Sequence, residues 1–306
     1  MVIEVFDRQI VRARRERAQI GFARHDFLFR EFGARLAERV EDVSRRFELA
    51  LDLGGHGGIL GDALLAGGRV DAVVHCDLSE RFARSAHAPS LVADEEALPF
   101  RDASFDLIAS NLSLHWTNDL PGALVQARRA LKPDGLFLAA LFGGETLVEL
   151  RACLLDAELA EDGGASPRVS PMAEMADMGG LLQRAGFALP VVDQDRIVVS
   201  YPDALALMRE LRAMGESNAV ARRTRRPTRR ATLARAAALY AERFGRKDGR
   251  IPATFQAFYL TAWAPHPGQQ QALRPGSAKA RLADALGATE TSGGVAVGRR
   301  EPDAKN

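Results

Sequence analysis

The sequence predicts a doubly wound α/β fold: a mostly parallel, seven-stranded sheet with an N-terminal helical lid and an inserted helical cap. Short apolar runs of strand length alternate with helix-compatible stretches. Alternation of this kind is typical of parallel strands joined by crossover helices. The first apolar run also ends in glycines, as a strand does when it leads into a tight turn.

Hydrophobic spacing predicts the elements of the first half. Asp26 is a candidate N-cap for the helix that follows it. Apolar residues of that helix recur at every fourth position, which gives it one apolar face for packing on a sheet. These residues are Leu28, Phe32, Leu36 and Val40. The runs that indicate strands are 47–53, 70–76, 90–93, 105–110 and 135–142.

The second half is less regular and predicts additions to the core. The expected elements are a helix over about 145–160, a helix ending at 184–187, a strand over 189–201, a helix from Pro202 to Met214 stopped by Gly215, an alanine-rich helix ending at Phe244, and a strand over 254–263. The expected regions are a lid over 1–46, a core over 47–142, cap helices with the last two strands over 143–267, and a disordered tail over 268–306.

Composition and charge argue against several classes of protein. The net charge is +1, so the overall electrostatic field of the protein does not favour a nucleic acid or a membrane as partner. Cys76 and Cys153 show no paired or metal-type spacing, and no histidine or carboxylate pattern proposes a metal. No apolar run approaches the ~20 residues that span a bilayer. We therefore expect a cytoplasmic protein without a metal, which reaches the inner membrane only through a partner.

A glycine-rich turn follows the first predicted strand. Residues 51–59 read LDLGGHGGI, and glycines at a strand-to-helix turn let the backbone approach a ligand closely. Asp77 ends the next apolar run. It lies about 20 residues past the loop, where a carboxylate binds ribose hydroxyls in nucleotide-binding folds. The turn and the acid together predict a nucleoside ligand.

The charge of the loop indicates which nucleoside binds. Dinucleotides place a pyrophosphate at the N-terminus of the following helix. Asp52 directly precedes the glycines, and its charge would repel that group. The same acid suits a ligand with an ammonium group and no phosphate. The sequence therefore favours S-adenosylmethionine (SAM) over NAD.

Several motifs resemble the class I SAM methyltransferases. Asp52–Gly58 is similar to their first motif, D-x-G-x-G-x-G, and LKPDG (131–135) to the sequence before their fifth strand. FDRQIVRARRERA, SLHWTNDLP, FGGETLVELR, MGESNA and PATFQAFY resemble one family of this superfamily across nearly the whole chain. It contains the mitochondrial complex I assembly factor that hydroxylates an arginine, and its relative is the malonyl-acyl-carrier-protein O-methyltransferase of biotin synthesis. SLHWTNDLP and MGESNA favour the assembly-factor branch.

This resemblance implies a cofactor site. Asp77 matches the ribose-binding acid and Asp94 the adenine-side acid, while Asn111 and Leu112 lie beside the methyl group. His56 replaces the central glycine of the loop, and its β-carbon narrows the room for the methionine part of SAM. The implied cofactor-binding residues are Asp52, Gly54, Gly55, His56, Gly58, Asp77, Leu78, Asp94, Glu95, Asn111 and Leu112.

His115 follows the fourth predicted strand, at the sheet edge where substrates bind. Imidazole titrates near neutral pH, so His115 is a candidate general base. Alternatively, His115 and Trp116 pack the loop against the core.

Arg222–Arg230 is the densest charge run, either a solvated loop or a docking patch for an acidic partner. An acyl carrier protein and a complex I subunit both remain candidates for that partner.

Three functions stay open. The first is a SAM-binding enzyme that methylates a complex I subunit, or hydroxylates its arginine as the resemblance implies. The others are methylation of malonyl-acyl-carrier protein and a non-catalytic assembly role.

Overall fold

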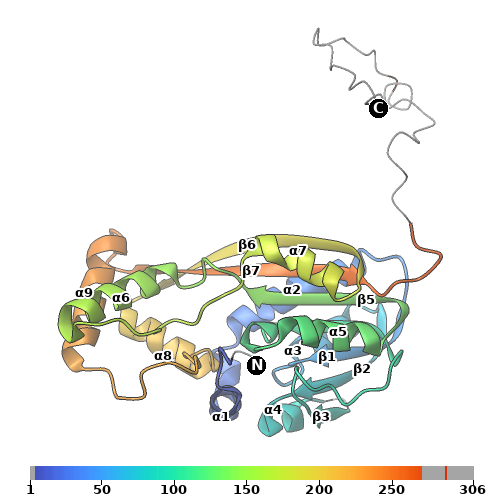
Figure 1. Cartoon of the computed structure of the whole chain (residues 1–306), viewed down its shortest axis with the longest axis horizontal. Helices are drawn as coiled ribbons and strands as arrows, with labels where there is room; N and C mark the ends of the chain where they lie inside the picture. Colours follow the sequence, from blue (N-terminus) through green and yellow to red (C-terminus); the bar gives the residue numbers. More distant parts are fainter. Residues whose placement is uncertain (1–3, 88, 271–286, 288–306) are drawn as a thin grey trace, which may run out of the picture. The chain divides into compact units, whose positions relative to one another are not determined.

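A seven-stranded sheet forms the centre of the molecule, in the order β3-β2-β1-β4-β5-β7-β6 (Figure 1). The computed structural model describes residues 4–87, 89–270 and 287. Strands β1 to β5 are parallel, whereas β7 is antiparallel to both of its neighbours, β5 and β6. The predicted doubly wound fold is therefore confirmed. The strands are β1 (Phe47–Leu53), β2 (Val70–Asp77), β3 (Ser90–Val92), β4 (Phe105–Asn111), β5 (Leu131–Phe142), β6 (Ala188–Tyr201) and β7 (Ile251–Trp263).

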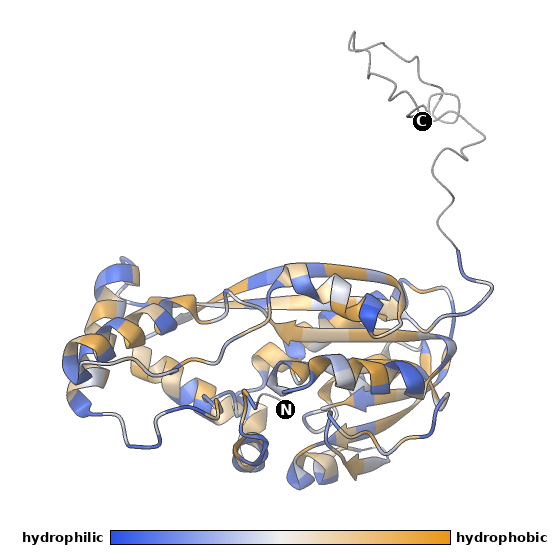
Figure 2. Ribbon diagram, in the orientation of Figure 1, coloured by the Kyte–Doolittle hydropathy of each residue, from blue (hydrophilic) through white to orange (hydrophobic). Residues whose placement is uncertain are grey.

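Helices cover both faces of this sheet. Ala50 of β1 packs in the cluster that holds α2 and α3, whereas its neighbour Leu51 packs in the cluster that holds α5 and α7. This follows from strand geometry, because successive side chains point to opposite faces. Figure 2 shows apolar residues along the central strands. The helices of the two layers are α2 (Phe27–Glu41), α3 (Ile59–Ala66), α4 (Glu80–Ser85), α5 (Leu120–Ala130) and α7 (Met175–Arg184).

Three further helices lie together beyond the ends of β6 and β7 (Figure 1). They are α6 (Val148–Asp162), α8 (Ala204–Met214) and α9 (Arg230–Phe244). Tyr240 of α9 is fully buried, and its hydroxyl donates to the carbonyl of Pro252 at 2.8 Å. That bond ties the helices to β7. None of the described helices is long and apolar enough to cross a membrane.

The N-terminal helix α1 (Arg8–Gln19) packs against both α4 and α8. Asp7 caps it by accepting from the Ile10 amide at 3.1 Å. The chain before α1 is also anchored, because Phe6 forms a bridge with Val220 and Asn118 Oδ1 accepts from the Phe6 amide at 2.7 Å. Helix α1 therefore lies between the sheet core and the added helices.

Some predicted boundaries are wrong for identifiable reasons. The helix expected from 145 begins at Val148, because the preceding turn is bonded to β7. There the Glu145 amide donates to Gln256 Oε1 at 3.0 Å, and Leu147 has φ +57. Asp26 does precede α2, but its carboxylate pairs with Arg30 at 2.7 Å and caps no backbone amide. Most of the tail predicted over 268–306 lies outside the described residues.

Candidate functional site

The glycine loop, residues 54–58, lies at the carboxyl end of β1 and packs closely against the segment that follows β4. Gly54 has φ +70, and a β-carbon built on it would lie 2.0 Å from Ser113 Oγ. The amides of Gly54 and Gly55 donate to the Cys76 carbonyl at 2.8 and 3.0 Å. Gly58 also has a positive φ, +97, at the start of α3. Glycine is required here both for conformation and for close approach.

Asp52 lies fully buried beneath this loop. Its Oδ2 accepts from the Gly61 amide at 3.2 Å and lies 2.9 Å from His75 Nδ1. Its Oδ1 has no hydrogen-bond partner. Sequence reasoning missed His75, because nothing in a strand-like run shows that one of its side chains turns toward the loop.

Asp77 ends β2 beside the loop and is also buried. Its two oxygens accept from the Ser79 amide at 2.8 Å and from the His56 amide at 3.0 Å. Burial raises the pKa of Asp77 to about 6, although Arg15, 3.6 Å away, acts in the opposite direction. Leu78, the next residue, is buried with it.

Glu95 and Asp94 bind two arginines of α1. Glu95, with 1% of its side chain exposed, accepts from Arg15 Nη1 at 2.9 Å and also from Arg8 and Ser113. Burial would raise the pKa of Glu95, but Arg15 and Arg8 hold it well below its usual range. Asp94 is more exposed and accepts from Arg8 at 2.6 Å. The N-terminal run contains both arginines, yet its sequence does not show that they reach these acids.

His56 lies in the loop with φ +44, a left-handed conformation that is unfavourable for a residue with a β-carbon. Its ring is buried among Phe22, Phe29 and Phe82, with ring centroids 6.0, 4.5 and 5.5 Å away. Burial, followed by the charge of Arg15, lowers the pKa of His56 well below its ordinary value. The ring is therefore neutral at pH 7 and forms part of an aromatic cluster.

Asn111 and Leu112 follow β4, next to the same loop. Asn111 Nδ2 donates to the Phe29 carbonyl at 2.7 Å, while its Oδ1 is buried without a partner. Leu112 is fully buried, has φ +49, and its amide donates to the Ala140 carbonyl at 2.8 Å. The structure thus brings all the sequence-predicted cofactor residues to one edge of the sheet.

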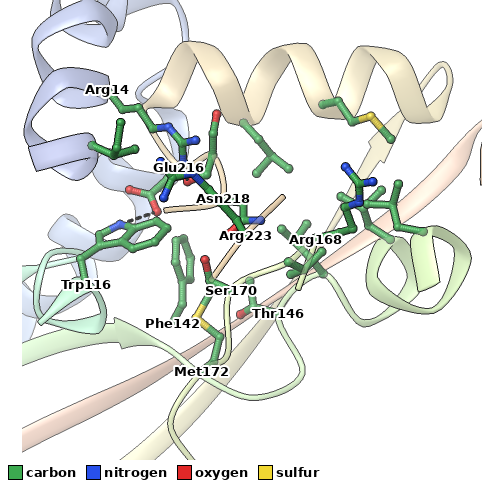
Figure 3. A pocket seen from close by; sticks show the side chains of 18 of the residues that line it. Arg14, Trp116, Phe142, Thr146, Arg168, Ser170, Met172, Glu216, Asn218 and Arg223 are labelled. Atoms are coloured by element: carbon green, nitrogen blue, oxygen red, sulfur yellow. Dashed lines mark hydrogen bonds between the residues drawn. The ribbon is translucent and has the colours of Figure 1, made fainter. Parts of the chain in front are cut away.

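A cavity of about 790 Å³ lies next to this edge, between α1, the end of β5 and the added helices (Figure 3). Its apolar lining includes Phe142, Leu150 and Phe255. Ser170 also lines it, and the Ser170 hydroxyl is buried without a hydrogen-bond partner. The charged residues of the lining are Asp7, Arg14, Arg168, Glu216, Arg223 and Arg225.

His115 lies behind the cavity wall, in contact with three of its lining residues, Glu216, Trp116 and Phe142. Glu216 Oε2 lies 3.0 Å from His115 Nε2 and accepts from Trp116 Nε1 at 3.0 Å. Figure 3 shows the Trp116 indole directed at this carboxylate. Trp116 and Glu216 line the cavity, while His115 is not among its lining residues. The role of His115 as a general base stays a prediction, and the contacts favour a positioning role.

The arginines of the cavity are unequally neutralised. Arg168 pairs with Glu158 at 2.6 Å, and Arg223 pairs with Asp7 at 3.3 Å. The pKa of Arg14 is lowered to about 10, by burial first and then by the charges of Arg223 and Arg17. The lining therefore has an excess of positive charge near Arg14.

The arginine run 222–230 is not one uniform patch. Arg223 and Arg229 bind acids of this chain, the latter Asp162 at 3.0 Å, and Arg230 begins α9. Arg222 and Arg226 are exposed. The exposed members leave the docking prediction open.

The acceptors of the loop region fit SAM. Asp52 Oδ1 and Asn111 Oδ1 are buried acceptors without a partner, and such groups normally bind a donor. The ammonium group of SAM supplies donors of that kind. Arg15, however, binds Glu95 and lies 3.6 Å from Asp77, where the nucleoside would bind. The residues fit the cofactor provided that Arg15 moves.

Comparison with known proteins confirms the resemblance. Residues 51–139 match the family described as "Methyltransferase domain". The chain is 43% identical to arginine-hydroxylase NDUFAF5 of Danio rerio, over 92% of this chain and 89% of the relative. It is 36% identical to malonyl-[acyl-carrier protein] O-methyltransferase of Laribacter hongkongensis, over 85% and 90%. A Bacillus halodurans crystal structure described as a methyltransferase matches with a TM-score of 0.54 at 16% identity, covering 76% of this chain and 99% of that one, which shows the shared fold. The chain therefore belongs to the methyltransferase-fold family that includes arginine-hydroxylase NDUFAF5 and malonyl-[acyl-carrier protein] O-methyltransferase.

Proposed function

We propose that this protein binds SAM at the carboxyl ends of β1, β2 and β4 and acts on a side chain of another protein in respiratory complex I assembly. The 43% identity to arginine-hydroxylase NDUFAF5 over 92% of the chain carries this proposal. The proposal that the cofactor is SAM is supported by the meeting of the glycine loop, Asp77, Asp94 and Glu95 at one edge of the sheet. The reaction on the acceptor is methyl transfer or arginine hydroxylation.

The chain's own residues have separate tasks in this proposal. Asp77 binds the ribose, and Asp52 and Asn111 accept from the ammonium group. SAM supplies an activated methyl group on its sulfonium centre. Because methyl transfer depends mainly on alignment of the acceptor, the cavity wall formed by Trp116 and Phe142 matters more than a strong base.

Glu216 is the group we assign to orienting the acceptor. Two ring nitrogens, of His115 and Trp116, hold one of its oxygens. Within the described lining of the cavity, the other carboxylate is Asp7, which is occupied by Arg223. Glu216 is therefore positioned to accept a hydrogen bond from an N–H or O–H of the substrate.

A specific observation favours a second candidate, methylation of a carboxylate on an acyl carrier protein. The cavity combines an apolar floor with excess positive charge near Arg14, and that combination suits a short acyl chain with a free carboxylate. The 36% identity to malonyl-[acyl-carrier protein] O-methyltransferase agrees with this alternative. A third candidate, a non-catalytic assembly factor, needs no SAM chemistry.

Cross-complementation separates the three candidates. We expect this chain, directed to mitochondria, to restore complex I activity in cells that lack NDUFAF5. We also expect that it does not restore biotin-independent growth in a bacterium that lacks malonyl-[acyl-carrier protein] O-methyltransferase. The Asp77→Ala variant is the control and should fail in the first assay. Rescue of biotin synthesis alone would contradict the leading proposal, and full rescue by Asp77→Ala would indicate the non-catalytic role.

A further inference from the structure

Helix α1 contributes residues to both the cofactor site and the cavity. Arg8 and Arg15 are two helical turns apart, so they lie on one face of the helix. Arg8 binds Asp94 and Glu95, and Arg15 binds Glu95. Ile10 and Arg14 lie on an adjacent face and line the cavity. One helix therefore forms a wall of each site.

Arg15 is unusually enclosed for a surface-helix arginine, with 3% of its side chain exposed. Its Nη2 donates to Ser113 Oγ at 2.7 Å, and its Nη1 donates to Glu95 at 2.9 Å. Burial would lower the pKa of Arg15, but Glu95 and Asp77 more than offset this effect. A charged guanidinium thus lies between Asp77, the acid proposed for ribose, and Glu95, which follows the adenine-side acid Asp94 in the chain.

We propose that α1 is a gate in which Arg15 and the cofactor compete for Asp77 and Glu95, so that cofactor binding displaces α1 and reshapes the cavity. This inference rests on the proposed function, because it concerns access to the same cofactor site. The cationic side chain takes the place of the ligand's polar groups, and it keeps these buried acids paired when the cofactor is absent.

Contacts of α1 with residues near the cavity explain why displacement of this helix changes the shape of the cavity. Arg14 Nη1 donates to the Ser217 carbonyl at 2.5 Å, next to Glu216. Arg8 Nη1 donates to the Trp116 carbonyl at 3.1 Å, and the rings of Phe6 and Trp116 are 5.3 Å apart. Displacement of α1 therefore acts on Trp116 through Arg8, and on Ser217, the neighbour of Glu216, through Arg14. The expected order is cofactor first and acceptor second.

Competition of this kind lowers the apparent affinity for the cofactor by the fraction of molecules in which the gate is open. A substitution that weakens the closed state should therefore tighten binding. Arg15→Gln removes the charge and shortens the side chain, so it weakens the pairing with Glu95 and Asp77 that holds the closed state. We expect its affinity for S-adenosylhomocysteine to rise by about 5- to 150-fold, the usual range of coupling between sites.

Calorimetric titration with S-adenosylhomocysteine tests this expectation on the full chain. Arg12→Gln is the matched control, since Arg12 is exposed on the same helix and should leave the affinity unchanged. Equal or weaker binding by Arg15→Gln, with clear binding by the wild type, would overturn the gate and leave the proposed cofactor intact. Absence of binding in both proteins would contradict the proposed cofactor and the gate together.

Amide hydrogen exchange of the wild type gives a readout that needs no variant. If the cofactor displaces α1, amides of residues 8–19 exchange faster when S-adenosylhomocysteine is added. Slower exchange in this segment would show that α1 closes on the ligand, and would overturn competition by Arg15.

Discussion

Replacing Glu95 by glutamine is expected to lower the free energy of unfolding by about 3 kcal/mol, the lower end of the range for breaking a buried ion pair. Arg15 and Arg8 share this carboxylate, and Arg15 and Glu95 are almost fully enclosed. Loss of the negative charge leaves Arg15 with Asp77 at 3.6 Å as its remaining ion-pair partner among the described residues, whereas Arg8 keeps Asp94 at 2.6 Å. Urea denaturation followed by far-UV circular dichroism measures the effect.

Glu96 provides the matched control for this substitution. It lies next in the chain, but 24% of its side chain is exposed and its carboxylate is 4.0 Å from Arg8. Its Oε1 also accepts from the Asn118 amide, and the amide oxygen of a glutamine can accept the same bond. Glu96→Gln should therefore lose only the long contact with Arg8, at a cost of no more than about 1 kcal/mol. Similar losses in the two variants would show that the buried cluster adds nothing beyond an ordinary surface pair.

Gly54→Ala is expected to have the second large effect. An alanine β-carbon at this position would lie 2.0 Å from Ser113 Oγ, in a backbone conformation of φ +70. The left-handed conformation costs about 1–2 kcal/mol for alanine, and overpacking adds about 1–3 kcal/mol. The loop must also move away from Ser113, so binding of the nucleoside should be lost.

Gly68→Ala separates these two costs. Gly68 has the same φ of +70, but nothing lies within 4 Å of its built β-carbon. The Gly68→Ala variant should lose only the cost of the left-handed conformation, about 1–2 kcal/mol of the free energy of unfolding. Thermal or urea unfolding measures both variants. If Gly54→Ala and Gly68→Ala lose equal stability, the close approach of loop and Ser113 is not a constraint.

Local patterns were sufficient to predict the parallel half of the fold. The apolar stretches of β1 to β5 are short and are followed by turns, and this information is contained in a few neighbouring residues. Strand β5 nevertheless begins at Leu131, earlier than the predicted 135. The sequence did not show that β7 inserts between β5 and β6, because the pairing of Tyr201 with Ile251 depends on long-range packing. Exact starts, such as Val148, depend on bonds to Gln256 more than 100 residues away.

Residues near the glycine loop differ in the same way. That Asp52, Asp77 and the glycines meet could be predicted, because strand ends of a parallel sheet meet at one edge, and their binding of the cofactor stays a prediction. Arg15 could not be assigned, since its partners Glu95 and Ser113 are 80 and 98 residues distant. The roles of the neighbouring acids also required the structure, which places Glu95 in the buried cluster and Asp94 nearer the surface.

Calorimetric titration with SAM tests whether this edge of the sheet is a cofactor site. We expect saturable binding by the wild type, weakened in Asp77→Ala by about 1 kcal/mol or more, the scale of lost hydrogen bonds. No detectable binding by the wild type or by Arg15→Gln would contradict it. The fold would then be a methyltransferase scaffold without its cofactor, and the assembly role would be the one to pursue.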